Sequence, residues 1–248
     1  MDLPTGRFIV NSFTLLLAIA LLLRTLVRTA RWMATASAQP GDRQHVATHH
    51  KDVYHTAFLL RQKLPADLVP GILDSAEYWV KSSASCTYHL TITEHDLRVG
   101  SRTSAELQGA LYHTSPLIAG DYEDISPLHP LRKVVFTITS KDQGWSSFPR
   151  DHGTYVNSWT WFEAVVLDWA DNAPIIPPRR ICTNVHAGTD FKTHIVTWTW
   201  DSDNDEERQW VRQVRRGSKI AINVWARYPG WANSIRTANI DIYTAAIR

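Results

Sequence analysis

The sequence has 248 residues, of which 44% are hydrophobic and 20% are charged, a balance typical of a folded protein with a substantial core. Its 26 lysines and arginines nearly balance its 24 aspartates and glutamates, and the basic residues are scattered, which argues against nucleic-acid binding. The two cysteines, Cys86 and Cys182, lie far apart. This spacing gives no metal site such as C-x-x-C, and it favours two reduced thiols over a single disulfide. The chain also has no Gly-rich phosphate loop, and we expect no cofactor.

An apolar run covers residues 8–23 near the N-terminus. As a helix extended to Val27 it reaches about 30 Å, the thickness of the hydrocarbon core of a bilayer. We therefore predict a single-pass membrane anchor in residues 1–33. Three arginines follow the run and one precedes it, so the positive-inside rule places the globular part in the cytosol.

Three alternatives to the anchor stay open. The sequence Ala36-Ser37-Ala38 is typical of a signal-peptide cleavage site, which would make the protein secreted. Residues 3–41 contain four arginines and no acid, as a mitochondrial presequence does. In the third alternative, residues 1–33 are a poorly retained extension of a cytosolic protein.

Residues 34–50 are polar, contain Pro and Gly, show no apolar period, and are predicted to be a linker. Residues 51–80 show helical spacing and predict a pair of short helices. The apolar face expected on the first comprises Val53, Ala57 and Leu60, widened by Phe58 and Leu59. The face expected on the second comprises Leu68, Ile72, Leu73, Ala76 and Trp79.

Residues 81–248 are rich in β-branched and aromatic residues, and several segments alternate with a period of two. We predict strands at 86–93, 131–140, 158–168, 193–200, 219–228 and 234–245. An acidic start, an apolar stripe and a terminal glycine predict one helix within 201–217. The expected fold class is mainly β: an antiparallel β-sandwich or jelly roll with two short N-terminal helices and one inserted helix.

The stretch Trp159 to Ala164 is apolar on both faces, which indicates a central strand. Glu163 in this strand needs a partner, and we expect Arg132 or Arg180.

The connection between the strands ending at Ser140 and starting at Ser158 is too long for a tight hairpin. It combines aromatic rings with planar polar groups, the chemistry that holds a sugar, and a Pro-Gly turn further along adds an arginine and a tryptophan. The candidate ligand-binding residues are Asp142, Trp145, Asp151, His152, Tyr155, Asn157, Arg227 and Trp231. Ligand binding predicts that Trp145, Tyr155 and Trp231 are exposed. The alternative is a structural corner of the sheet, with aspartates that cap turns and aromatic rings that cover the core.

Calcium binding and glycan hydrolysis are two further possibilities. Asp201, Asp203 and Asp205 match the start of a calcium-binding EF-hand loop, but the glycine and the final glutamate of that loop are missing, so helix capping is favoured. A glycan-acting enzyme would need two of Asp151, His152 and Glu163 in one cleft.

The patches DQGW, HGTY, WTWFE and ARYPGW lie between Leu64 and Arg248. With the order of strands, they resemble a group of uncharacterised fungal β-sandwich proteins and, more loosely, the galactose-binding-like jelly rolls. This resemblance implies a module that binds a carbohydrate, a glycoprotein or a protein partner. The stretch LPADLVPGIL, at 64–73, resembles the first helix of an F-box and implies a ubiquitin-ligase adaptor, although the two further F-box helices do not follow it.

Overall fold

The computed structural model describes residue 47 and residues 49–100, 109–119 and 127–247. The predicted anchor at 1–33 lies outside these ranges. Within the described part of the chain, no helix is both long enough and apolar enough to cross a membrane.

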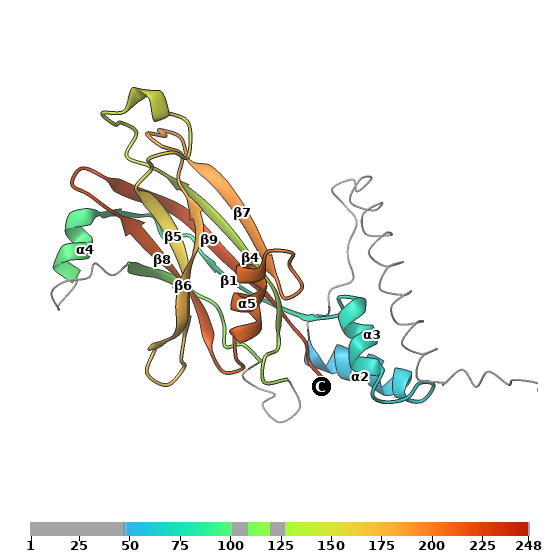
Figure 1. The fold of residues 1–248 in the computed structure, drawn as a ribbon. Helices are drawn as coiled ribbons and strands as arrows, with labels where there is room; N and C mark the ends of the chain where they lie inside the picture. The colour runs from blue at the N-terminus through green and yellow to red at the C-terminus, as the bar shows by residue number, and fades with distance from the viewer. Residues whose placement is uncertain (1–46, 48, 101–108, 120–126, 248) are drawn as a thin grey trace, which may run out of the picture.

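Two antiparallel sheets stack face to face, so the predicted β-sandwich is confirmed (Figure 1). The first sheet has the order β1 (Val80–Cys86), β9 (Ala232–Thr244), β4 (Leu131–Lys141) and β7 (Lys192–Thr199), and β2 (Leu90–Thr93) also pairs with β9. The second sheet has the order β3 (Ala110–Thr114), β8 (Lys219–Ala226), β5 (Thr160–Leu167) and β6 (Pro174–Thr183).

Alternation along the strands builds the core between the sheets. Val134, Phe136 and Ile138 point inward from β4 and are fully buried, as their spacing predicts. Strand β5 lies between β8 and β6 and is buried on both faces, which confirms the central position expected for it.

Two short helices, α2 (His50–Arg61) and α3 (Val69–Ser75), precede the sandwich and pack on a separate small core near the C-terminus (Figure 1). Asp74 of α3 accepts two hydrogen bonds of 3.0 Å from Arg132 of β4, a bidentate ion pair that joins α3 to the first sheet.

The apolar faces predicted for these helices are narrower than expected. On α2, Val53 and Ala57 are buried, but Phe58 and Leu59 are exposed. The second helix buries Leu73 but leaves Leu68 and Ile72 exposed. Because the helices cover only the end of the sandwich, only a narrow apolar stripe of each helix is buried.

Helix α5 (Asp205–Gln213) is the predicted inserted helix. Asn204 is its N-cap and accepts a hydrogen bond of 3.0 Å from the backbone N–H of Glu207. Trp210 and Val211 are buried, and the Trp210 ring meets Trp198 of β7 edge to face at 4.9 Å. The helix is therefore attached to the sandwich by its apolar side.

Several elements were not predicted. The expected strand at 86–93 is interrupted, since β1 ends at Cys86 and β2 begins at Leu90, and α4 (Glu94–Gly100) follows at once. Strand β6 was missed because its three prolines argue against a strand; it pairs with β5 alone, and proline is tolerated at such an edge. Strand β3 was missed because it is short.

The expected arginine partner of Glu163 is wrong. The carboxylate accepts hydrogen bonds of 2.8 Å from the indole N–H groups of Trp161 and Trp225. Arg132 pairs with Asp74 instead, and the guanidinium of Arg180 lies 4.5 Å from the centre of the Trp161 ring.

Cys86 and Cys182 are free thiols in different sheets, and burial raises the pKa of Cys182 to about 12.

Candidate ligand-binding site at the loop end of the sandwich

Three connections meet at one end of the sandwich, which we call the loop end (Figure 1). They are residues 142–159 between β4 and β5, residues 184–191 between β6 and β7, and residues 227–231 between β8 and β9. The 142–159 connection includes the short 3-10 helix η1 (Pro149–Asp151). All eight candidate residues belong to the first and third connections.

Asp142 supports the loop end from inside. Only 1% of its surface is exposed, and its two oxygens accept hydrogen bonds from the Thr160 hydroxyl, at 3.1 Å, and from the Ala187 backbone N–H, at 2.8 Å. Burial raises its pKa above the ordinary value, although these hydrogen bonds oppose the rise. Its role as a ligand contact is therefore corrected, because the carboxylate faces the protein interior.

The buried polar network beneath the loops was not predicted from the sequence. Asn184 accepts a hydrogen bond from Ser140 at 2.7 Å and donates to Thr160 and Asn233 at 3.0 and 2.9 Å. Asn233 in turn donates to the Trp161 carbonyl at 3.3 Å. These bonds connect strands of both sheets, and they hold the base of the loop end in one arrangement.

The polar candidates in the 142–159 connection bond to one another. The Asn157 amide donates to Asp151 at 2.6 Å, and Asn157 has a φ of 53°, a left-handed conformation that asparagine tolerates. The Nε2 atom of His152 lies 3.2 Å from the Ser146 carbonyl oxygen. These contacts shape the loop.

His186, which was not predicted as a site residue, fastens that loop to its neighbour. The side chain is fully buried, and its Nδ1 atom lies 2.8 Å from the Val156 carbonyl oxygen, so Nδ1 is the donor. The His186 backbone N–H donates to Thr154 at 2.7 Å, and its carbonyl accepts from Gly153 at 3.0 Å. Three contacts thus restrict the 153–156 segment.

Two aromatic candidates face solvent from this fixed framework. Trp145 and Tyr155 are each 60% exposed. A Cβ atom placed on Gly230 would lie 3.3 Å from the Trp145 ring, so that ring reaches across to the turn between β8 and β9. Tyr155 lies edge-on to His194, with ring centres 6.4 Å apart. Phe148 is a further exposed ring of the same connection.

The turn between β8 and β9 contributes the other two candidates. Arg227 is exposed, and its guanidinium lies 5.5 Å from the centre of the Tyr228 ring, which is itself exposed. Trp231, for which we expected exposure, is half-buried because its ring packs edge-on against His186 at 5.3 Å. This turn therefore presents one exposed candidate, Arg227, and one half-buried candidate, Trp231.

Two of the side chains considered for catalysis, Glu163 and Asp151, make structural hydrogen bonds instead. Both carboxylate oxygens of Glu163 are bonded to indole N–H groups, and Asp151 is bonded to Asn157. Within the described residues, no hydrogen bond, ion pair or ring contact links Glu163 to Asp151 or His152. No group of three histidine, cysteine or acidic side chains among them is arranged to hold a metal ion.

No protein-family model matches the sequence, and no curated protein matches it at a significant level. Among solved structures, the chain is similar to a xylan-binding module, CBM15, at 11% identity over 66% of this chain and 97% of that one, with a TM-score of 0.28. A family two carbohydrate esterase from Cellvibrio japonicus is similar at 8% identity over 66% of this chain and 35% of that one, with a TM-score of 0.24.

The VP2 subviral particle of infectious bursal disease virus is similar at 12% identity over 68% of this chain and 34% of that one, with a TM-score of 0.30. The chain thus spans about a third of the esterase and of the viral protein. At these identities and TM-scores, the likenesses carry no inference about what this chain binds.

Proposed function

We propose that this chain is a non-catalytic binding module that recognises a carbohydrate, free or on a glycoprotein, through its loop end. The supporting observation is the exposure of Trp145 and Tyr155 on loops that hydrogen bonds hold in place. Burial is the usual state of large aromatic rings, and rings presented on a rigid loop stack on the apolar face of a sugar at little entropic cost.

Polar groups of the loop end suit the same ligand. Arg227 and Asn157 are exposed and carry planar donors, which bond to pairs of sugar hydroxyls. Because Asp142 is buried, it contributes to the site only by supporting the loops.

The test is binding of the purified full chain to a panel of immobilised glycans, followed by calorimetry on each hit. Trp145→Ala and Tyr155→Ala are each expected to weaken binding roughly tenfold, because each removes one stacking surface. Tyr88→Ala is the matched control, since Tyr88 is a similarly exposed ring in the turn between β1 and β2. Unchanged affinity in both loop-end variants, or no glycan bound, would refute the proposal.

A second candidate function is the F-box-like adaptor. The favouring observation is the exposed apolar set of Leu64, Leu68 and Ile72 on and before α3, because such faces mark protein interaction sites. The opposing observation is that β1 begins at Val80, so no further helices follow α3 directly. This function predicts that a ubiquitin-ligase subunit specific for F-boxes binds the chain and that Leu68→Asp abolishes the binding. An absence of binding would eliminate the candidate.

A further inference from the structure

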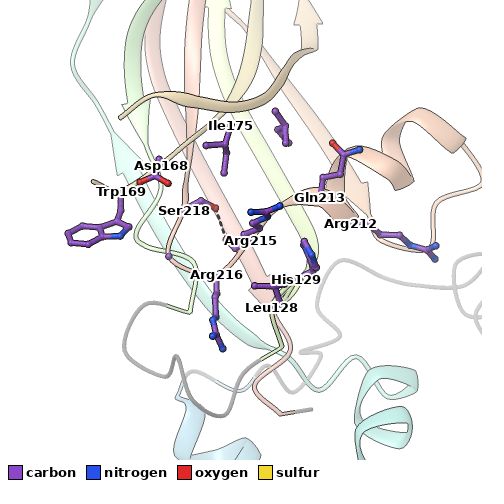
Figure 2. Close-up of a pocket in the computed structure, with 12 residues that line it drawn as sticks. Leu128, His129, Asp168, Trp169, Ile175, Arg212, Gln213, Arg215, Arg216 and Ser218 are labelled. Atoms are coloured by element: carbon purple, nitrogen blue, oxygen red, sulfur yellow. Dashed lines mark hydrogen bonds between the residues drawn. The ribbon is translucent and has the colours of Figure 1, made fainter. Parts of the chain in front are cut away.

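A pocket of about 820 Å³ opens at the end of the sandwich opposite the loop end (Figure 2). Asp168 and Trp169 in its lining follow the end of β5, whereas the 142–159 loop precedes that strand. Likewise, Gly217 and Ser218 precede β8, and the 227–231 turn follows it. The volume lies within the range of about 300–1,000 Å³ usual for small-molecule sites.

Backbone hydrogen bonds fix the wall formed by the α5–β8 connection. The N–H of Arg216 donates to the Leu128 carbonyl at 3.0 Å, and the N–H of Gly217 donates to the Ile118 carbonyl at 2.8 Å. The Ser218 hydroxyl donates to the Arg215 carbonyl at 2.6 Å, the dashed line in Figure 2. These three hydrogen bonds fix this wall of the pocket.

The lining is strongly basic for a chain whose charges nearly balance. Three arginines, Arg212, Arg215 and Arg216, and one acid, Asp168, belong to the lining, although the Arg212 side chain points away from the pocket. Asp168 accepts a hydrogen bond of 2.8 Å from the Ala170 backbone N–H, so it stabilises the turn after β5. The excess positive charge favours an anionic ligand.

Stabilisation of the C-terminal end of α5 is the competing explanation for these arginines. It accounts for Arg212, whose Nε atom donates to the Trp200 carbonyl at 2.7 Å and whose side chain points away from the pocket. It does not account for Arg215. Figure 2 shows this exposed side chain in the middle of the pocket, and among the described residues its guanidinium makes no hydrogen bond or ion pair, so it is open to solvent or to a ligand.

Apolar and aromatic groups complete the lining. Trp169 is 64% exposed at one side of the pocket, next to Gly217, and Leu128 and Ile175 are exposed as well. A lining that combines exposed apolar and aromatic groups with basic side chains can hold a molecule that is apolar on one part and charged on another.

We propose that this pocket binds a small organic anion in which a carboxylate or phosphate is attached to a ring. The oxyanion pairs with the Arg215 guanidinium, and the ring lies against the apolar and aromatic groups of the lining. An acidic sugar and a nucleotide share this chemistry. The site is independent of the proposed glycan site, because the two occupy opposite ends of the sandwich.

Calorimetric titration of the full chain tests the proposal with glucuronate, adenosine monophosphate, inorganic phosphate, and the neutral analogues glucose and adenosine. At least one of the two ring-bearing anions is expected to bind at least roughly tenfold more tightly than its neutral analogue and than inorganic phosphate. The anion that binds identifies the source as sugar or nucleotide. Raising the salt concentration from about 50 mM to about 500 mM is expected to weaken binding.

Arg215→Gln is expected to weaken that binding roughly tenfold or more, and Trp169→Ala is expected to weaken it too. Arg150→Gln is the matched control, because it removes an exposed arginine from the loop end. The proposal is overturned if neither ring-bearing anion binds, if inorganic phosphate binds as tightly as they do, or if Arg215→Gln has no effect.

Discussion

Asp142 is a buried carboxylate whose folded-state pKa lies above its ordinary value of 3.8 because burial disfavours its charge. Above that ordinary value, the native state therefore holds more protons at this group than the unfolded chain does. In that range the contribution of Asp142 to stability falls as the pH rises through the folded pKa.

Asp142→Asn removes this dependence. Between about pH 3.5 and about pH 7, the stability of the variant is expected to improve relative to the original chain. Urea unfolding of both proteins across that interval measures the change, and Asp190→Asn, at an exposed aspartate, is the control. A difference that stayed constant, or that moved toward the original chain, would contradict the assignment.

Glu163 illustrates what the sequence could not reveal at the scale of single residues. Its need for a partner follows from its place in a central strand, but the identity of the partner depends on which side chains β5 and β8 place together. Glu163→Gln leaves one amide oxygen to accept a hydrogen bond and turns an NH2 group toward the other indole N–H, so one bond is weakened and the other is lost. We expect a loss of about 1–3 kcal/mol of unfolding free energy.

Chemical denaturation measures that loss. Glycan hydrolysis, measured in parallel, separates a structural role of Glu163 from a catalytic one. A stable Glu163→Gln variant would show that the indole hydrogen bonds contribute little. Glycan turnover by the original chain that disappeared in the variant would instead favour the enzyme alternative.

At the scale of elements, strands were predictable where one side chain in two faces the core. This holds for β4, whose inward side chains are fully buried. It fails for β6, because prolines at a sheet edge give no strand signal, and for Phe58 and Leu59, because the sequence does not indicate how little of α2 would be covered.

The candidate site was predictable to a similar extent. A long loop rich in aromatic residues indicated that Trp145 and Tyr155 would be exposed, and they are. The contacts that hold the loop, such as Asp142 with Ala187 and His186 with Val156, join residues 30 or more positions apart, and no local pattern encodes them.

Helix α5 gives a prediction at this scale. Asn204→Ala removes the side chain that caps the helix and should lower the unfolding free energy by about 1 kcal/mol. Gln209→Ala, at an exposed position of the same helix, is the control and should be close to neutral. Thermal melting of both variants checks this expectation, and equal melting temperatures would contradict the capping role.

At the scale of the whole molecule, the two ends of the sandwich differ in chemistry. One end presents aromatic rings on rigid loops, and the other holds a basic pocket beside α5. A module with two such sites would bind a sugar surface at one end and a small anion at the other.

The predicted anchor in residues 1–33 concerns the molecule as a whole. We expect the full chain to sediment with membranes through alkaline carbonate washing and a chain that lacks these residues not to. In sealed vesicles of cytosolic-side-out orientation, added protease should digest the sandwich. Release of the full chain by carbonate would contradict a membrane-spanning anchor, and protection of the sandwich would contradict the predicted orientation.

The most direct test of the loop-end site is acrylamide quenching of tryptophan fluorescence in the full chain, with and without each glycan, and with Trp145→Phe as the comparison. We predict that one glycan protects an accessible tryptophan from acrylamide and that the protection disappears in Trp145→Phe. Quenching that no glycan changes, or protection that persists without Trp145, would contradict the proposal that the loop end is the carbohydrate site.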